Sequence, residues 1–353
     1  MKQLFEISDV YMEKSDNWTS FENESELLGE ICLNRIAGIA YGNLKRLPQL
    51  RTIKEFENTL SAVYNDNVSR TRLFKQNVKY LSQILKDANF RYALLKGAFL
   101  ITKLYTEGYR TSNDVDILIE EVDISKCQDL LKQNGFIQGY FDKQKKEVMP
   151  ATRREVILSR MNYGETVPFV KVINDHPFYV DINFSLDFKP EKEKMIVSKL
   201  LSRVEEVSFE GIKFNTLGIK DFMIHLCCHL YKEASTMEWV KERRDLQLYK
   251  FSDINVCLHE CIDQAFFDKL IDRIFDYGTQ KECYYTFYNI AIIYPKLKEI
   301  EGFCDMLDRI KPNDSEFMKQ IIDPLNNKVY KYTIPFEEWF FVKNRLEYLV
   351  ETK

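Results

Sequence analysis

The chain has 353 residues, of which 45% are hydrophobic and 29% are charged, and this balance is typical of a soluble globular protein. Its formal net charge of −4 argues against a general nucleic-acid-binding surface, because such a surface carries an excess of Lys and Arg. No segment reaches the roughly 18 apolar residues of a membrane span, and the acidic, polar opening is unlike a signal peptide. Because the eight cysteines include no C-x-x-C pair, we expect reduced thiols in a cytoplasmic protein.

Helical spacing of apolar residues dominates the first part of the chain, and we expect a helical region over residues 1–90. Within it, the polar stretch 64–67 is either a local break or the solvated face of a helix. A short apolar run over 92–95 then predicts a strand that Gly97 ends. The next elements are predicted as a helix over about 98–105 and a strand over 114–120.

The middle of the chain is predicted to mix helices and strands. An amphipathic helix is expected over 125–134, because Gly135 suits the position just after a helix C-terminus. Runs of β-branched and aromatic residues predict further strands over 156–161, 169–173 and 178–184. From Thr216 onward, the pattern is helical to the C-terminus apart from turns.

Two aspartates, Asp114 and Asp116, alternate with apolar residues in the strand expected over 114–120. Residues two apart on a strand project from the same face, with Cα atoms roughly 6.5–7 Å apart, so both carboxylates can reach one divalent cation. An otherwise apolar strand has little reason to carry two like charges on one face unless a metal neutralises them. The alternative is an ordinary pair at the solvated start of a strand.

Asp181 is a third carboxylate in an apolar strand, flanked by Val180 and Ile182. Three carboxylates brought together in one sheet can hold two Mg²⁺ or Mn²⁺ ions for in-line phosphoryl displacement, since hard oxygen ligands suit these metals. The alternative for Asp181 is an ion pair with a neighbouring Lys or Arg.

The turn around Gly97 is the predicted phosphate site. A glycine between a strand and a helix lets the backbone approach a phosphate, and Lys96 and Arg110 offer charges that neutralise a triphosphate. The alternatives are a surface position for Lys96, a plain turn at Gly97, and a helix cap or an Asp114 partner for Arg110.

Two other clusters have a structural and a functional interpretation. His225 and His229 lie four residues apart beside apolar positions, so buried, hydrogen-bonded histidines are favoured over a zinc site that also uses Cys257, His259 and Cys261. Five basic residues are either a solvated loop, which is favoured, or an electrostatic rim for a triphosphate or an acidic acceptor. They are Lys143, Lys145, Lys146, Arg153 and Arg154.

The motifs around the aspartates resemble the signature of the uncharacterised nucleotidyltransferase family within the polymerase β-like superfamily. The resemblance extends over roughly residues 25–300 and includes a helical segment with His225 and His229, followed by Trp239–Leu246. Asn183 stands where members often have His, and Ala98 where the superfamily typically has Gly or Ser. The matching positions are Leu94–Ala98, Tyr105, Arg110, Asn113–Ile119, Tyr179–Asn183 and Trp239–Leu246.

The resemblance implies an α+β fold in which a small mixed-sheet nucleotidyltransferase palm over 91–212 is flanked by helical regions over 1–90 and 213–353. It implies that Asp114 and Asp116 bind metal and that Asp181 helps to activate the attacking hydroxyl. It also implies a nucleotide site at Lys96, Gly97, Ala98 and Arg110, although Ala98 offers no hydroxyl to a phosphate.

The expected activity is therefore metal-dependent transfer of a nucleoside monophosphate, most simply AMP from ATP, with Mg²⁺ or Mn²⁺ as cofactor. The acceptor is a small molecule, a peptide or a protein, since the net charge of −4 argues against a nucleic acid. One alternative keeps the fold without catalysis, as a nucleotide-binding regulatory or antitoxin-like protein. Another is a helical scaffold protein.

Overall fold

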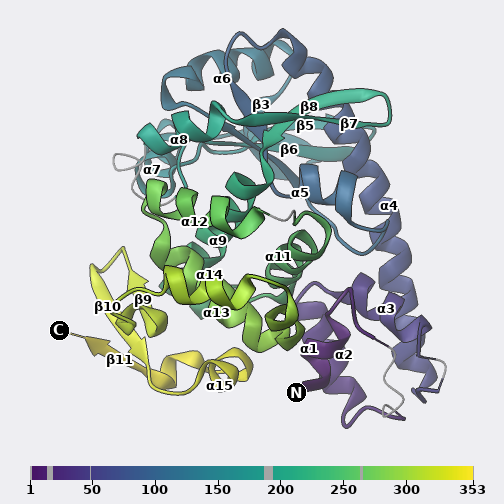
Figure 1. Cartoon of the computed structure of the whole chain (residues 1–353). Coiled ribbons are helices and arrows are strands. Elements are labelled where there is room, and N and C mark those ends of the chain that lie inside the picture. The colour runs from purple at the N-terminus through teal and green to yellow at the C-terminus, as the bar shows by residue number, and fades with distance from the viewer. Residues whose placement is uncertain (1, 14–18, 48, 187–193, 263–264, 353) are drawn as a thin grey trace. The chain divides into compact units, whose positions relative to one another are not determined.

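The computed structural model describes residues 2–13, 19–47, 49–186, 194–262 and 265–352 (Figure 1). They form two compact units. Unit 1 joins residues 1–66 to 223–353, and unit 2 comprises 67–222. Residues 1–66 of the expected N-terminal helical region share unit 1 with 223–353 of the expected C-terminal region, and the expected palm over 91–212 lies within unit 2. The unit boundaries fall inside two helices, α4 (Lys54–Ile84) and α9 (Ile219–Ala234).

Unit 2 contains an eight-stranded mixed sheet in the order β4-β3-β5-β6-β2-β1-β8-β7. The pairs β2–β6 and β1–β8 are parallel, and the other neighbours are antiparallel. The strands are β1 (Tyr92–Leu94), β2 (Asp114–Ile119), β3 (Ile137–Asp142), β4 (Glu147–Pro150), β5 (Phe169–Ile173), β6 (His176–Asn183), β7 (Val204–Phe209) and β8 (Ile212–Leu217).

The helical elements of unit 2 flank this sheet together with the second half of α4. They are η1 (Leu85–Asp87), α5 (Gly97–Phe99), the π-helical turn η2 (Leu100–Leu104), η3 (Glu121–Asp123), α6 (Ile124–Gln133), α7 (Arg153–Tyr163) and α8 (Lys194–Leu201).

One face of the central strands forms the core of unit 2. Alternate residues of β2 and β6, such as Val115, Ile117 and Val180, are buried against Phe74 of α4 and Leu131 of α6. Burying an apolar side chain of this size contributes roughly 1.5–3 kcal/mol to stability. The apolar residues therefore determine which face of β2 and β6 is turned toward the core. The residues between them along β2 and β6 therefore project from the opposite face.

The expected strands around the aspartates are confirmed as β1, β2, β5 and β6, and the helix after Gly97 is confirmed as α5 followed by η2. The helix expected over 125–134 is α6, and Gly135 after it has a φ of 81°. The polar stretch 64–67 lies within α4, so it is a helical segment and does not break the helix.

The strand expected over 156–161 is wrong, because these residues belong to α7. Thr152 and Glu155 form a capping box, in which the Glu155 amide donates to the Thr152 hydroxyl at 3.3 Å and the Thr152 amide donates to the Glu155 carboxylate at 2.7 Å. These bonds satisfy free amide groups at the helix start and favour a helix despite the β-branched residues that follow.

Unit 1 consists mainly of helices. Besides the first part of α4 and most of α9, they are α1 (Lys2–Ile7), α2 (Glu24–Leu33), α3 (Ala37–Lys45), α10 (Met237–Lys241), α11 (Leu248–Glu260), α12 (Phe266–Tyr277), α13 (Gln280–Ile293), η5 (Pro295–Glu299), α14 (Phe303–Ile310), η6 (Glu316–Lys319), α15 (Phe336–Phe341) and η7 (Arg345–Tyr348). No helix in the described part of the chain combines the length and the apolar character needed to cross a bilayer.

The expectation of helices from Thr216 to the C-terminus is wrong in two places. Residues up to Leu217 belong to β8, and a three-stranded sheet lies near the C-terminus (Figure 1). Its strands are β9 (Gln320–Asp323), β10 (Lys328–Tyr332) and β11 (Leu349–Thr352). The ring of Tyr332 stacks on the fully buried Trp339 with centroids 4.5 Å apart, which ties this sheet to α15.

Buried polar contacts explain why the two ends of the chain share unit 1. The Tyr294 hydroxyl lies 2.9 Å from the hydroxyls of both Ser8 and Ser252, and the Asn43 amide donates to the Ile7 carbonyl at 2.9 Å. Such contacts favour one particular packing of the segments, because a buried polar group without a partner would lose its hydrogen bonds to water and gain none in the protein. The contact between Ser8 and Tyr294 joins residues that lie 286 positions apart, from opposite ends of the sequence.

Candidate active site

The register of β2 and β6 brings the three predicted aspartates to one face of the sheet. Asp116 pairs with Asp181, and Asp114 pairs with Tyr179. Directly paired residues of parallel strands project from the same face, and so do residues two apart on one strand. Asp114, Asp116 and Asp181 therefore share the face opposite the core, together with Asn183.

Asp116 lies at the centre of the polar contacts on this face. It is only 6% exposed, and its Oδ1 accepts from the Lys96 ammonium at 2.9 Å and from the Asn183 amide at 3.2 Å. Asp114 is held by a separate contact, in which the Ser112 hydroxyl donates to its Oδ1 at 3.0 Å. Each of the two β2 carboxylates is thus oriented by a neighbouring polar group.

Asp181 has a pKa well above the usual carboxyl range. Burial is the largest cause, and the nearby carboxylates of Asp114, Asp116 and Glu165 raise the pKa further, against the opposing effect of Lys96. One lysine therefore faces several carboxylates whose mutual repulsion favours protonation. Among these groups that act on the pKa of Asp181, three carboxylates face one ammonium, so negative charge is in surplus around Asp181.

These donors suit a hard divalent cation, because carboxylate oxygens are the ligands that Mg²⁺ and Mn²⁺ prefer and the negative surplus needs a cation. As the side chains stand, no three or more His, Cys, Asp or Glu in the described part of the chain are arranged to hold a metal ion. The ammonium of Lys96 contacts Asp116, where a cation would bind.

Lys96 is held in an unusual backbone conformation, with φ 41° and ψ −113°, immediately before α5. A positive φ in a residue other than glycine costs roughly 1–3 kcal/mol and persists where the surroundings enforce it. The Leu95 amide, one residue earlier, donates to the Asp116 carbonyl at 3.0 Å and extends the β1–β2 pairing. The turn thereby directs the Lys96 side chain toward Asp116.

Gly97 has a packing role at this turn. A Cβ added there would lie 3.0 Å from the Ser112 Cβ and 3.2 Å from the Phe74 ring, closer than side chains ordinarily pack. Its missing side chain thus makes room for Ser112, which in turn holds Asp114.

None of the four predicted phosphate residues (Lys96, Gly97, Ala98 and Arg110) lines the pocket that Asp114 and Asp181 share. Ala98 is fully buried among the apolar residues of unit 2. Arg110 is 7% exposed, and its guanidinium donates to the Thr111 carbonyl.

A pocket of about 640 Å³ lies beside the acidic face at the start of β2 and β6. Both Asp114 and Asp181 line it, and three basic residues, Arg70, Lys143 and His176, line it as well. The full lining is Arg70, Leu73, Phe74, Asn77, Ser112, Asn113, Asp114, Lys143, Pro168, His176, Pro177, Tyr179 and Asp181. A site with acidic and basic residues in one cavity suits a cation together with an anionic ligand.

Sequence reasoning missed Arg70, His176 and Glu165. Arg70 lies in α4 and donates to the Asn113 side chain at 2.5 Å, across 43 positions of sequence. Glu165 forms an isolated bridge with Asn183 and raises the pKa of Asp181. No motif marks these residues, because their position depends on long-range packing.

The basic cluster is divided between two elements. Lys143, Lys145 and Lys146 lie in the turn between β3 and β4, and Arg153 and Arg154 begin α7. Neither strand of this hairpin was predicted from the sequence. Lys143 is the member that lines the pocket beside Asp114.

The two histidines of the alternative zinc site lie in α9, within unit 1. The rings of His225 and His229 are 6.3 Å apart, and His229 lies 3.6 Å from Glu233. His225 is 6% exposed, in keeping with the buried position favoured by the sequence.

The chain matches the model of the family described as "Uncharacterised nucleotidyltransferase" over residues 22–295. No curated protein matches it. A match to the crystal structure of an antigenic nucleotidyltransferase-like protein from Paracoccidioides brasiliensis has 13% identity, spans 62% of this chain and 92% of that one, and has a TM-score of 0.29, too low to support an inference. The family match covers most of the sequence and includes every predicted aspartate. The chain belongs to the uncharacterised nucleotidyltransferase family.

Proposed function

We propose that this protein transfers a nucleoside monophosphate, most simply AMP from ATP, to a hydroxyl or phosphate of a small molecule, peptide or protein, with pyrophosphate as the leaving group. The observation that carries the proposal is the parallel register of β2 and β6, which pairs Asp116 with Asp181 and puts Asp114 on the same face. Family membership supports nucleotidyl transfer as the general activity.

Asp114, Asp116 and Asp181 would hold Mg²⁺ or Mn²⁺. When bound, these ions neutralise the charge that develops on the transferring phosphoryl group. Lys96 now neutralises Asp116 and would move its ammonium to a phosphate oxygen of the nucleotide. Arg70 and Lys143 supply further positive charge to the pocket that Asp114 and Asp181 line.

Asp181 is the proposed proton acceptor. Without metal, burial and the neighbouring carboxylates raise its pKa, whereas a bound cation would favour the ionised carboxylate, which is the form that accepts a proton. A hydroxyl of the acceptor in the pocket would pass its proton to an Asp181 carboxylate oxygen as it attacks the α-phosphorus. The pyrophosphate would leave beside the basic residues of the pocket.

The second candidate is a nucleotide-binding protein with a regulatory or antitoxin-like role and no transfer activity. Ala98 favours it, because its methyl group is buried in the core and offers no hydroxyl to a phosphate. Pyrophosphate release distinguishes the two functions, because a regulatory protein binds the nucleotide and leaves it intact.

The test is to incubate the protein with each nucleoside triphosphate, Mg²⁺ and candidate acceptors, and to measure pyrophosphate release and the mass added to the acceptor. We expect one nucleoside monophosphate to be added per transfer. The double variant Asp114→Asn/Asp116→Asn should lose about 10³-fold or more of this activity, because metal sites stabilise the transition state by several kcal/mol.

Asp129→Asn is the matched control, because Asp129 is a 68% exposed carboxylate in α6 of the same unit. It should transfer at the parent rate. If the double variant also transfers at the parent rate, or binds ATP and Mg²⁺ as tightly as the parent, the site assignment is wrong.

A further inference from the structure

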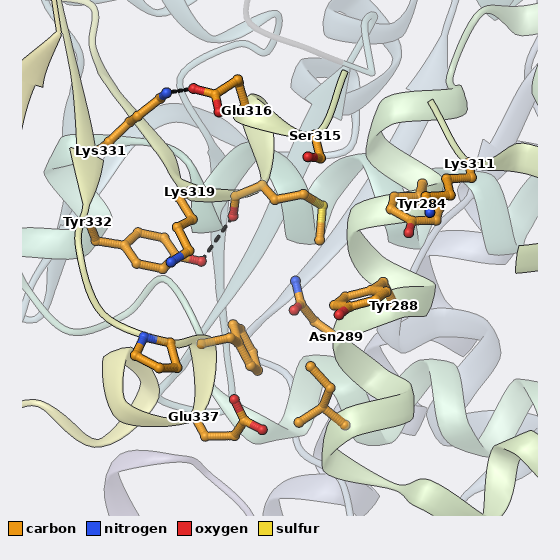
Figure 2. A pocket seen from close by; sticks show the side chains of 14 residues that line it. Tyr284, Tyr288, Asn289, Lys311, Ser315, Glu316, Lys319, Lys331, Tyr332 and Glu337 are labelled. Carbon is orange, nitrogen blue, oxygen red and sulfur yellow. Dashed lines mark hydrogen bonds and ion pairs between the residues drawn. The ribbon is translucent and has the colours of Figure 1, made fainter. Parts of the chain in front are cut away.

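A pocket of about 680 Å³ lies within unit 1 (Figure 2). It is formed by α13, η6, β10 and the start of α15, so it is separate from the aspartates of unit 2. Its lining is Tyr284, Tyr288, Asn289, Ile292, Lys311, Ser315, Glu316, Met318, Lys319, Lys331, Tyr332, Pro335, Phe336 and Glu337. Its volume falls in the range typical of small-molecule sites.

Aromatic side chains line two sides of this pocket. Tyr284 and Tyr288 of α13 have ring centroids 5.7 Å apart at an angle of 30°, and Tyr288 is 45% exposed. Tyr332 and Phe336 are buried, and the stacking of Tyr332 on Trp339 holds its ring in place. Such rings offer flat apolar surfaces against which another planar ring can stack.

Asn289 is the polar group of the pocket that points to a ligand. It is 1% exposed, and its Nδ2 has no hydrogen-bond partner in the described part of the chain. Figure 2 shows its carboxamide extending from α13 into the pocket. A buried donor without a partner destabilises a folded protein, and an acceptor atom on a bound ligand would satisfy it.

The charged residues that line this pocket carry more positive than negative charge, which favours an anionic ligand. Lys331 forms an ion pair with Glu316, which leaves Lys311, Lys319 and Glu337 as the other charged lining residues. Lys319 donates to the Ile334 carbonyl at 3.1 Å and lies 5.7 Å from the Tyr332 ring centroid. Its charge therefore lies beside an aromatic wall.

We propose that this pocket binds a small planar aromatic molecule that carries a phosphate or a carboxylate. The ring of the ligand stacks on Tyr288, an acceptor atom receives a hydrogen bond from the Asn289 amide, and the anionic group pairs with Lys319. This site rests on residues of unit 1 alone and does not depend on nucleotidyl transfer.

The test is direct binding of two probes, AMP and indole-3-acetate, measured by saturation-transfer NMR and calorimetry with EDTA present. The Asp114→Asn/Asp116→Asn protein serves as the background, so that the aspartates of unit 2 contribute no metal-dependent binding. We expect at least one probe to bind, and the identity of that probe distinguishes a phosphate from a carboxylate ligand.

Asn289→Leu should weaken this binding by about tenfold or more, because it removes the donor while keeping the volume of the side chain. Tyr288→Ala should weaken it as well, whereas Phe275→Ala should not, because Phe275 is a 50% exposed aromatic residue on α12 outside the pocket. Thermal melts of each variant verify that the protein is folded.

The proposal is overturned if neither probe binds, or if Asn289→Leu and Tyr288→Ala bind as the background protein does. Its failure is distinguishable from failure of the proposed function. Loss of transfer in the aspartate variant with intact probe binding supports both proposals, and intact binding without any transfer by the parent protein contradicts only nucleotidyl transfer.

Discussion

The two units differ in how their buried carboxylates are paired with cations. In unit 1, two deeply buried carboxylates each have a cation of their own, since Lys250 pairs with Glu233 and Arg345 pairs with Asp245. The side chains of Asp245 and Arg345 are 0% and 4% exposed. Burial raises the pKa of Asp245, and Arg345 and Lys250 act against this rise.

In unit 2, Lys96 is paired with Asp116 while the carboxylates of Asp114, Asp181 and Glu165 lie close enough to interact. A buried pair with matched charges holds a fold together, whereas a surplus of one sign costs stability and needs a ligand of opposite charge. The difference supports the proposal that the face of β2 and β6 is a functional site, whereas the pairs of unit 1 fit a structural role.

Breaking a matched pair should have the largest effect. Arg345→Met leaves the Asp245 carboxylate buried without its cation, and we expect the free energy of unfolding to fall by about 3–5 kcal/mol in denaturant titrations. Lys328→Met is the control, because Lys328 and its partner Glu351 are about half exposed and such pairs contribute at most about 1 kcal/mol. An equal loss of unfolding free energy in both variants would show that the buried pair contributes no more than an exposed one.

Loss of the Asn183 amide should lower activity without unfolding the protein. Asn183 orients Asp116 through the 3.2 Å contact to Oδ1, and residues that orient metal ligands typically contribute 10- to 100-fold. We therefore expect Asn183→Ala to release pyrophosphate roughly 10- to 100-fold more slowly, with unchanged circular dichroism. Asn215→Ala, a change at another partly exposed asparagine of the same sheet, should leave the rate unchanged.

Removal of the Lys96 ammonium should increase the negative charge around Asp116 and so strengthen metal binding. Without nucleotide, Lys96→Met should bind Mn²⁺ about tenfold more tightly than the parent, because the ammonium 2.9 Å from Asp116 no longer competes. Electron paramagnetic resonance of free Mn²⁺ measures the affinity. Lys103→Met, at an exposed lysine of η2, is the control, and the same gain there would show a nonspecific charge effect.

The smallest expected effect is a gain in stability. The pKa of Asp181 is raised in the folded protein, so the stability that its proton contributes is present below the ordinary carboxyl pKa of about 4 and is lost as the pH rises toward the raised value. Asp181→Asn should therefore raise the melting temperature at pH 7 in EDTA by about 2–4 °C, the shift that ~1 kcal/mol produces in a domain of 150–250 residues. The gain should vanish near pH 3.5, and an equal gain at both pH values would contradict the charge surplus.

Much of the candidate site was predictable because its signal is local. Alternation of Asp114 and Asp116 with Val115 and Ile117 predicts both a strand and the face that carries the acids, since the strand period is two residues. Elements without such a signal were missed or misassigned. The strand β9 has four residues, too few to establish a period, and the apolar residues after Thr152 look like a strand although the capping box makes them a helix.

The sequence by itself determined that three aspartates lie in apolar strands and that the turn at Lys96 and Gly97 precedes Asp114 and Asp116. Only the tertiary structure decided that Asp116 pairs with Asp181, that Lys96 neutralises Asp116, and that Glu165 lies near enough to raise the pKa of Asp181. The physical reason is that strand and helix periods depend on neighbouring residues, whereas register and charge pairing depend on packing between segments distant in sequence.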